Sequence, residues 1–307
     1  MKYLITGVNG FVGKYFVEFL HDKEKDAKIY GASTSADCQR QGVEYYSIDL
    51  TDRFKVYRMI ESINPDYVIH LAAISSVSQS WKDPARCFLN NCSSFLNLVD
   101  SIRELNIKCR ILSVGSSEEY GIYDELIDES FVLHPKNPYA VARLSQEYLS
   151  KLYVDNFDLD IVMTRSFNHI GPRQNSKFVI PSFVQQLVRI YKGEQTELKV
   201  GNLDVIRDFL DVRDVVSAYY EILKRGKKRE VYNVCSGKGH KLRDIIETVS
   251  KEFGISPKIT VDPTRIRSNE IMSVVGDNSK LKKELGWTPV HTLRETLRDM
   301  IEERKRV

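Results

Sequence analysis

Several common features are missing from this chain of 307 residues, and each absence excludes a class of protein. The five cysteines are odd in number and include no Cys-x-x-Cys pair, which argues against a disulfide framework and a zinc site. No signal peptide opens the chain, and no apolar stretch approaches the ~20 residues of a membrane-spanning helix. We therefore expect a cytoplasmic protein with buried thiols, no metal and no membrane partner.

A strong charge of one sign is also missing, because the formal net charge is only +3. The basic clusters at 224–229 and 302–306 are short and suit solvated helix ends, so we expect no nucleic-acid partner. Hydrophobic residues make up 42% of the chain and charged residues 28%, as in ordinary globular proteins. The length allows one large domain or two modest ones.

A glycine loop stands at the start of the chain. Residues 2–6 form a short β-prone run, and a helical pattern with Phe16, Phe19 and Leu20 at core spacing follows the loop. Strand, glycine loop and helix in this order predict a dinucleotide site, since glycines let the backbone approach pyrophosphate at a helix N-terminus. The residues expected to line it are Gly7, Asn9, Gly10, Phe11, Val12 and Gly13.

The second predicted strand, 28–31, lacks the acidic residue that usually follows it in NAD sites. It runs into Ala-Ser-Thr-Ser at 32–35, and the next acid is Asp37. An acid at this place takes the ribose 2′-hydroxyl of NAD, whereas hydroxyls suit a 2′-phosphate. Ser33, with help from Arg40, therefore favours NADP(H), and NAD(H) is the alternative.

Strands and helices alternate through residue 165. Helical patterns at 52–63 and 85–106 are interleaved with apolar strands at 65–73 and 158–165, which predicts a doubly wound α/β fold. A lone histidine that closes an apolar strand, His70, is interpreted as structural. After about residue 167 the elements are shorter, which fits a small lobe over a cofactor domain.

The stretch 110–143 has the pattern of an active-site edge. An apolar strand ends in hydroxyls and carboxylates, including Ser116 and Glu118, and side chains there project beyond the sheet. Tyr139 and Arg143 are four residues apart, so they share a helix face, where a fixed cation favours the phenolate. Taken alone, the pair also suits an interfacial aromatic beside a solvated charge.

Together these motifs resemble one enzyme family over essentially the whole chain. Thr6-Gly-x-x-Gly-x-x-Gly13, Asp49-Leu50, His70-Leu-Ala-Ala73, the Ser-Ser-Glu strand end and Tyr139-x-x-x-Arg143 resemble the extended short-chain dehydrogenases/reductases. More narrowly, the segments 116–121, 167–173, 200–203, 207–209 and 232–237 are similar to the GDP-4-keto-6-deoxymannose reductases, which make GDP-6-deoxymannose.

The resemblance implies a fold, a reaction and a set of roles. The fold is a Rossmann doubly wound parallel sheet at 1–166, carrying cofactor and catalytic residues, with a smaller, interleaved substrate lobe mainly at 167–307. NADPH would reduce the 4-keto group of a GDP-linked 4-keto-6-deoxy hexose or heptose. Tyr139 would donate the proton, Ser116 would hydrogen-bond the same oxygen, and Arg143 would anchor the nicotinamide ribose. Further cofactor contacts would come from Asp49, Leu50, Leu71, Ala72 and Ala73, and substrate contacts from Asn168, Arg207, Arg267 and Glu270.

Two positions depart from the family pattern. Its catalytic lysine is Arg143 here, and its Arg-Pro-x-Glu turn reads Arg267-Ser-Asn-Glu270. A GDP-mannose 4,6-dehydratase, with Glu118 as the base at C5, remains an alternative. A nucleotide-sugar-binding protein with impaired catalysis is another.

The resemblance also implies a homodimer through a four-helix bundle. The helices at 85–106 and 138–153 carry more apolar residues than one buried face needs, including Phe88, Phe95, Tyr148 and Leu149. Asp208, Asp211 and Asp214 are expected to cap a helix instead of holding a metal. His169 is expected to orient its loop.

Overall fold

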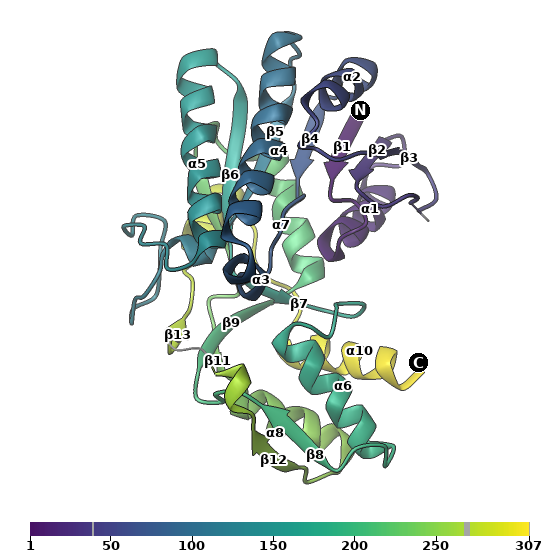
Figure 1. The fold of residues 1–307 in the computed structure, drawn as a ribbon, viewed down its shortest axis with the longest axis vertical. Helices are drawn as coiled ribbons and strands as arrows, with labels where there is room; N and C mark the ends of the chain where they lie inside the picture. The colour runs from purple at the N-terminus through teal and green to yellow at the C-terminus, as the bar shows by residue number, and fades with distance from the viewer. Residues whose placement is uncertain (39, 267–270, 307) are drawn as a thin grey trace.

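The computed structural model describes residues 1–38, 40–266 and 271–306, which form a large lobe and a small lobe (Figure 1). In the large lobe the described residues make a seven-stranded parallel sheet in the order β10-β6-β5-β4-β1-β2-β3. Its strands are β1 (Lys2–Thr6), β2 (Lys28–Ser33), β3 (Val43–Ser47), β4 (Tyr67–His70), β5 (Arg110–Ser116), β6 (Asp160–Ser166) and β10 (Val231–Val234). The predicted doubly wound α/β fold is confirmed.

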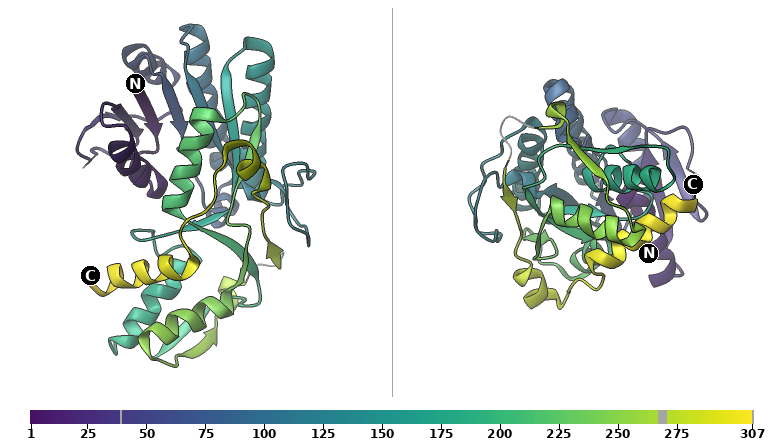
Figure 2. Two further views of the ribbon diagram at one scale, coloured as in Figure 1. Left: turned by 180° about the vertical axis from the view of Figure 1, so that it is seen from behind. Right: turned by 90° about the horizontal axis from the view of Figure 1, so that it is seen from below.

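Helices cover both faces of this sheet. Figure 1 shows α4 and α5 in front of it, and the view from behind in Figure 2 shows α7 across the other face. The helices of the large lobe are α1 (Phe11–Lys23), α2 (Arg53–Ile63), α3 (Val77–Lys82), α4 (Pro84–Glu104), η1 (Ser117–Glu119), α5 (Pro138–Phe157), α7 (Val212–Arg225) and α9 (Ser279–Leu285).

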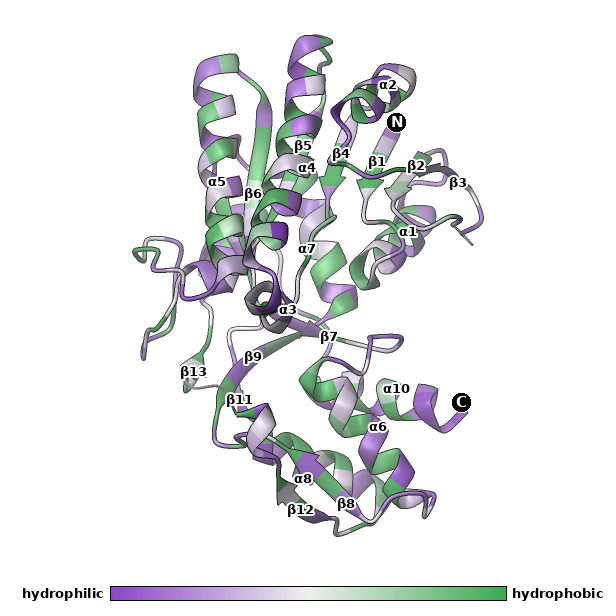
Figure 3. Ribbon diagram, viewed as in Figure 1, coloured by the Kyte–Doolittle hydropathy of each residue, from purple (hydrophilic) through white to green (hydrophobic). Residues whose placement is uncertain are grey.

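Side-chain alternation along the strands explains why both faces are covered. Ile5 of β1 packs with Phe16 of α1 in one core cluster, whereas its neighbour Leu4 packs with Phe95 of α4 in the other. Successive residues of a strand point to opposite faces, so a strand with no polar face needs a layer on each side. Figure 3 shows the resulting concentration of hydrophobic residues along the large sheet.

The small lobe lies below the carboxyl ends of these strands and has a core of its own. Its strands are β7 (Asn168–Ile170), β8 (Glu197–Val200), β9 (Ile206–Asp211), β11 (Gly239–Lys241), β12 (Lys258–Val261) and β13 (Ser273–Val274). Its helices are α6 (Val179–Tyr191), α8 (Leu242–Phe253), η2 (Pro263–Arg265) and α10 (Leu293–Arg306). Phe183, Ile245 and Met300 bring α6, α8 and α10 together in one cluster.

Several expectations need correction. Phe95, which the sequence places among the apolar residues expected at a dimer interface, is fully buried in the core of this chain, and Leu149 packs partly against the same cluster. Asp211 caps α7 as expected, but Asp208 and Asp214 do not cap a helix. Asp208 accepts hydrogen bonds from the Ser236 and Gly237 amides, and Asp214 accepts from the Val290 and His291 amides.

The cysteines, the helix lengths and the grouping of possible metal ligands each bear on an expectation from the sequence. All five cysteine thiols are free, and Cys87, Cys92, Cys109 and Cys235 are buried. Within residues 1–38, 40–266 and 271–306, no helix combines the length and apolar character that crossing a membrane requires. Over the same ranges, no three His, Cys, Asp or Glu side chains gather as a metal would need.

Candidate active site

The glycine loop between β1 and α1 is shaped by contacts that leave no room for side chains. Gly7 has φ of +70°, and a Cβ added there would lie 2.9 Å from the Ala72 nitrogen. A Cβ on Gly13 would lie 2.6 Å from the Gly7 carbonyl oxygen and 2.7 Å from that of Val8. Such contacts are shorter than atoms tolerate, so the turn requires glycine at both positions.

This loop presents the N-terminus of α1 without a side-chain cap. Gly10 is the N-cap residue, and no described side chain accepts from the first amides of the helix. Bare amides and the helix dipole attract an anion such as pyrophosphate. Phe11 stacks on His169 of β7 with ring centroids 6.1 Å apart, which joins the loop to the small lobe. His169 Nδ1 also lies 3.2 Å from the Phe167 carbonyl oxygen, so it holds its own loop as expected.

The end of β2 lies beside the same loop, and a tyrosine organises it. Asn9 Nδ2 donates to Ser33 Oγ at 3.1 Å and to the Asp37 carbonyl at 2.9 Å. The Tyr45 hydroxyl, from β3, lies 2.8 Å from Ser33 Oγ and donates to the Ser35 carbonyl at 2.6 Å. In the described part of the chain, the hydrogen-bond partners of Ser33 Oγ are amide and hydroxyl groups and none is a carboxylate, which fits a 2′-phosphate better than a bare 2′-hydroxyl.

The other residues predicted to contact the cofactor differ in where their side chains lie. Leu71, Ala72 and Ala73 follow β4 and are half-buried, and the Ala72 amide donates to Thr6 Oγ1 at 3.3 Å. They therefore line the same edge as Gly7. Leu50, in contrast, buries its side chain in the core, and the Asp49 carboxylate is exposed and accepts from Thr51. Sequence position alone did not reveal that Leu50 packs inward.

His70 is structural, as interpreted. It is fully buried, and its Nδ1 lies 3.0 Å from Thr6 Oγ1. Burial, together with the positive charge of Arg143, lowers the pKa of His70 to about 3. The ring is therefore neutral at physiological pH and serves to join β4 to β1.

The end of β5 holds Ser116 in a defined orientation. Ser116 is the N-cap of η1, and its Oγ accepts from the Glu118 amide at 3.3 Å. Glu119 Oε1 in turn accepts from the Ser116 amide at 2.7 Å, which completes a capping box. Ser116 is only 7% exposed, and because its Oγ accepts from the Glu118 amide, its hydroxyl hydrogen is available to another acceptor.

Tyr139 and Arg143 lie together on the first two turns of α5, as their spacing predicts. Arg143 Nε donates to the Tyr139 hydroxyl oxygen at 3.3 Å, and Arg143 Nη1 donates to Gln146 Oε1 at 2.8 Å. Gln146 is anchored to β5 through Ser113 Oγ, 2.9 Å from its Nε2. Because the phenol oxygen accepts from the cation, its own hydrogen is available to another acceptor.

Glu118 is joined to the start of α5. Asn137 caps this helix by accepting from the Ala140 amide at 2.9 Å, and its Nδ2 donates to Glu118 Oε2 at 2.7 Å. The same asparagine therefore sets the position of the Glu118 carboxylate relative to Tyr139. Asn137 was not predicted as a site residue, although an Asn before a Pro at a helix start was a visible signal.

Behind this edge lies a buried ion pair that the sequence analysis missed. Arg165 of β6 donates to both carboxylate oxygens of Glu147 at 2.8 Å, and to the Tyr120 hydroxyl at 2.9 Å. Tyr120 donates to Asn233 Oδ1 at 2.7 Å. These residues tie β6, α5 and β10 together, and removing one partner of such a buried ion pair is strongly destabilising.

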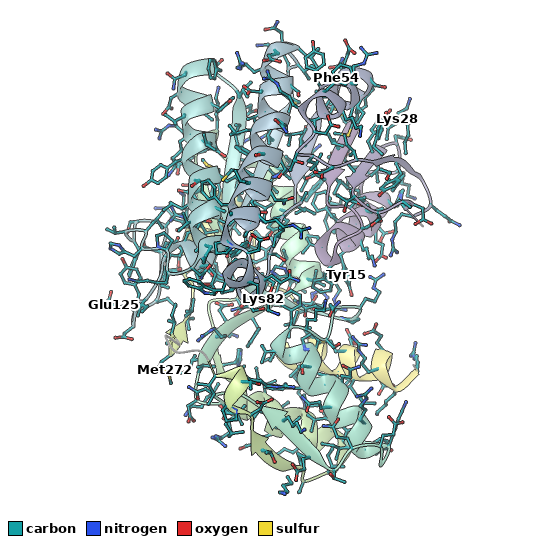
Figure 4. All side chains as sticks on the ribbon, viewed as in Figure 1. Tyr15, Lys28, Phe54, Lys82, Glu125 and Met272 are labelled. Atoms are coloured by element: carbon teal, nitrogen blue, oxygen red, sulfur yellow. The ribbon has the colours of Figure 1, made fainter. Side chains whose placement is uncertain are left out.

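The predicted substrate residues lie on the small lobe as far as they are described. Asn168 of β7 is exposed, and its Nδ2 donates to the Asp208 carbonyl at 3.3 Å. Arg207 of β9 is half-buried and donates to the carbonyls of Ile206, at 2.8 Å, and Ile271, at 2.6 Å. Arg267 and Glu270 lie outside the described residues. The described chain resumes at Ile271, and the next residue, Met272, is labelled in Figure 4.

The two lobes are joined at the junction that Tyr15 marks in Figure 4. Tyr15 of α1 donates to the Pro172 carbonyl at 2.9 Å, and the Arg173 guanidinium lies 4.3 Å above its ring. Arg173 also pairs with Glu18 through two hydrogen bonds, at 2.6 and 2.7 Å. The cofactor loop and the small lobe are therefore positioned against each other by direct contacts.

Comparison with known proteins agrees with this geometry. A family model described as GDP-mannose 4,6 dehydratase matches residues 4–300. The chain is 34% identical to GDP-6-deoxy-D-mannose reductase of Pseudomonas aeruginosa, over 98% of this chain and 96% of that protein. It is 30% identical to GDP-6-deoxy-D-talose 4-dehydrogenase of Aggregatibacter actinomycetemcomitans, over 93% of this chain and 92% of that protein.

Matches to solved structures agree with these sequence matches. RMD from Pseudomonas aeruginosa, complexed with NADPH, matches with a TM-score of 0.87 and 32% identity, over 100% of both chains. UDP-glucose 4-epimerase from Thermotoga maritima, solved with UDP-glucose, matches with a TM-score of 0.91 and 25% identity, over 100% of this chain and 99% of that one. With a family model spanning nearly its full length, a glycine loop and a Tyr–Arg pair at the expected edge, this chain belongs to the GDP-mannose 4,6 dehydratase family of extended short-chain dehydrogenases/reductases.

Proposed function

We propose that this protein reduces the 4-keto group of a GDP-linked 4-keto-6-deoxy sugar, hexose or heptose, with NADPH. The observation that carries the proposal is the Tyr139–Arg143 pair, in which Arg143 Nε lies 3.3 Å from the Tyr139 hydroxyl oxygen and both side chains are buried on α5. The chain that bears this pair is similar over 98% of its length to a GDP-6-deoxy-D-mannose reductase. Residues 1–166 form most of the cofactor half, and residues 167–307 form most of the sugar-nucleotide half.

The chain's own residues supply acid catalysis and orientation. When bound, NADPH supplies the hydride that adds to C4 of the sugar. Tyr139 donates its phenolic proton to the C4 oxygen, and the Ser116 hydroxyl donates a hydrogen bond to that oxygen. The Arg143 guanidinium stabilises the phenolate that remains on Tyr139. A positioned acid of this kind contributes about 10²–10⁴-fold to rate.

The cofactor half fits NADPH by its donor set. The Gly7–Gly13 turn and the uncapped start of α1 accept a pyrophosphate, and Ser33 and Asn9 offer hydroxyl and amide groups at the end of β2. The similar RMD structure is complexed with NADPH. NAD(H) is the alternative, because the more distant UDP-glucose 4-epimerase of Thermus thermophilus, 27% identical, is in complex with NAD.

The sugar-nucleotide half rests on Asn168 and Arg207, together with Arg267 and Glu270. Guanidinium groups match phosphate oxygens bidentately, so Arg207 is assigned to the diphosphate and Asn168 to its sugar side. Glu270 is assigned to the ribose hydroxyls. Arg207 already donates to backbone carbonyls, so binding requires an exchange of these acceptors for phosphate oxygens.

The protein is further proposed to act as a homodimer through α4 and α5. Apolar side chains on these helices are exposed, among them Leu89 at 61%, Tyr148 at 56% and Leu152 at 53%. Exposed apolar residues grouped on two adjacent helices suit an isologous interface. Light scattering at micromolar concentration should give twice the chain mass or a higher even multiple, and a monomer mass would contradict the interface.

A GDP-mannose 4,6-dehydratase is the second candidate, and Glu118 is the observation that favours it. Its carboxylate is half-buried and is held by Asn137 at 2.7 Å, at the start of the helix that bears Tyr139. Such a carboxylate could remove the C5 proton during dehydration. A protein that binds nucleotide and cofactor without turnover is the third candidate, because Arg143 replaces the expected lysine.

Two incubations separate these candidates. With GDP-4-keto-6-deoxymannose and NADPH, the reductase oxidises NADPH and forms a GDP-6-deoxy sugar that mass spectrometry detects. With GDP-mannose and NADP⁺, the dehydratase accumulates a 4-keto product. Tight binding of both ligands with no product in either incubation would favour the third candidate, a protein that binds nucleotide and cofactor without turnover.

A further inference from the structure

A second glutamate next to Ser116 has no role in the mechanism above, yet it is completely buried. Glu119 ends η1 and is 0% exposed, although carboxylates are rarely buried without a cation bound to them. Its Oε1 accepts from the Ser116 amide at 2.7 Å. Its Oε2 has no hydrogen-bond partner within the described part of the chain.

The contact with Ser116 has a directional consequence. With Glu119 holding the Ser116 amide, the backbone turns so that Ser116 Oγ accepts from the Glu118 amide. A hydroxyl whose lone pair is occupied in this way keeps its hydrogen for a different acceptor. The capping box therefore aims the donor of Ser116 outward from η1.

Among the described residues, the neighbouring cations do not form an ion pair with the Glu119 carboxylate. Arg165, from β6, is committed to Glu147 through two hydrogen bonds, and Glu147 of α5 adds a second negative charge. Arg165 and, more weakly, Arg143 of α5 still attract the Glu119 carboxylate from a distance. Burial first, and the Glu147 charge second, raise the pKa of Glu119 to about 8. Both effects favour the protonated, neutral carboxyl group, which keeps an acceptor oxygen for the Ser116 amide.

We propose that Glu119 is a positioning residue of the reductase, which fixes the Ser116 hydroxyl in the orientation that donates to the C4 oxygen of the sugar. This inference rests on the proposed reductase function. Glu119 touches neither substrate nor cofactor in this scheme, and it acts only through Ser116. Glutamine, which keeps an acceptor oxygen of the same reach, can replace it, whereas an apolar residue of similar size cannot.

The test compares Glu119→Gln and Glu119→Leu with GDP-4-keto-6-deoxymannose and NADPH. Glu119→Leu should lower kcat by roughly 10–100-fold, since small misplacements of a catalytic group cost this much. Its KM for the sugar nucleotide and its Kd for NADPH should change less than about threefold, because an unoriented donor weakens the transition state more than the ground state. Glu119→Gln should retain most of the wild-type kcat.

A control separates orientation from stability. Ile60→Ala, in the core cluster on α2, should lower Tm as a cavity does while leaving kcat unchanged. Equal kcat for Glu119→Leu and the wild type would overturn the positioning role, as would an equal loss in Glu119→Gln and Glu119→Leu. Absence of reduction by the wild-type protein would instead refute the proposed function, and the role of Glu119 with it.

Discussion

The two halves of the candidate site are held by different means. On the cofactor side, the ends of β1, β2 and β4 converge, and the Gly7–Gly13 turn is shaped by backbone atoms alone. On the side proposed to bind the sugar nucleotide, Asn168 and Arg207 are side chains that already donate to carbonyls of the protein. The glycine turn is therefore preformed, whereas Asn168 and Arg207, in their proposed roles, must exchange protein acceptors for ligand oxygens. The Tyr139–Arg143 pair on α5 is the proposed catalytic link between the two halves.

The largest effect should come from the residue shared by both halves. Tyr139→Phe removes the proton donor and should lower kcat by roughly 10²–10⁴-fold. The Kd for NADPH should stay within about twofold, because the ring and its packing remain. Steady-state kinetics and fluorescence titration measure the two quantities. Tyr191→Phe, at an exposed tyrosine of α6 outside the site and the proposed dimer interface, is the control and should behave as the wild type. An active Tyr139→Phe variant would assign the proton to another group.

Arg143→Lys should raise turnover. The planar guanidinium is bulkier than an ammonium and contacts both the Tyr139 hydroxyl and Gln146. A lysine reaches the phenol and the ribose hydroxyls as a point charge, and correcting a misplacement of ~1 Å can restore up to about 100-fold in rate. Nucleotide affinity, measured by titration, should barely move. An unchanged or lower kcat would show that arginine is a fully working residue at this position.

Arg207→Ala tests whether the sugar-nucleotide half and the cofactor half bind their ligands independently. Loss of a charged hydrogen bond to phosphate costs ~1.5–3 kcal/mol, so KM for the sugar nucleotide should rise about 10-fold or more. The Kd for NADPH should be unchanged if the halves are independent. Arg189→Ala removes the same charge from an exposed site on α6 of the same lobe and serves as the control. An equal change in NADPH binding would show that the halves are coupled.

Ser33→Asp tests the cofactor half alone. A carboxylate beside the 2′-phosphate adds like-charge repulsion, and about 1.4 kcal/mol corresponds to a tenfold change in affinity. The ratio of the Kd for NADPH to the Kd for NADH should therefore rise by at least about tenfold, as titration with both cofactors would reveal. A clear preference for NADH in the unmodified protein would contradict the interpretation of Ser33.

The smallest effect concerns pH and stability. Glu119 ionises near pH ~4.3 in an unfolded chain, whereas its pKa in the folded protein is raised to about 8. Its contribution to stability is thus fully present below the unfolded pKa and is lost as pH rises through about 8. The Tm of Glu119→Gln should exceed that of the wild type by an amount that grows from pH 5 to pH 8. Calorimetry that finds a constant difference would show that Glu119 is ionised in the fold.

The sequence by itself determined the features that depend on local spacing. The order of strands and helices in the large lobe, the glycine turn and the shared face of Tyr139 and Arg143 follow from periods of two and 3.6 residues and from backbone freedom at Gly7. Ser116 could be placed at an edge of the sheet because the carboxyl ends of parallel strands meet there.

Only the tertiary structure decided which polar side chains are buried and with what partners. Phe95 could be assigned to a dimer face or to the core until α4 was packed on the sheet, and Leu50 could face a ligand or the interior. Arg165 pairs with Glu147 across 18 positions of sequence, and Tyr120 reaches Asn233 across 113. No spacing rule encodes such contacts, because they arise where separate elements meet. The burial of Glu119 beside Ser116 is of this kind.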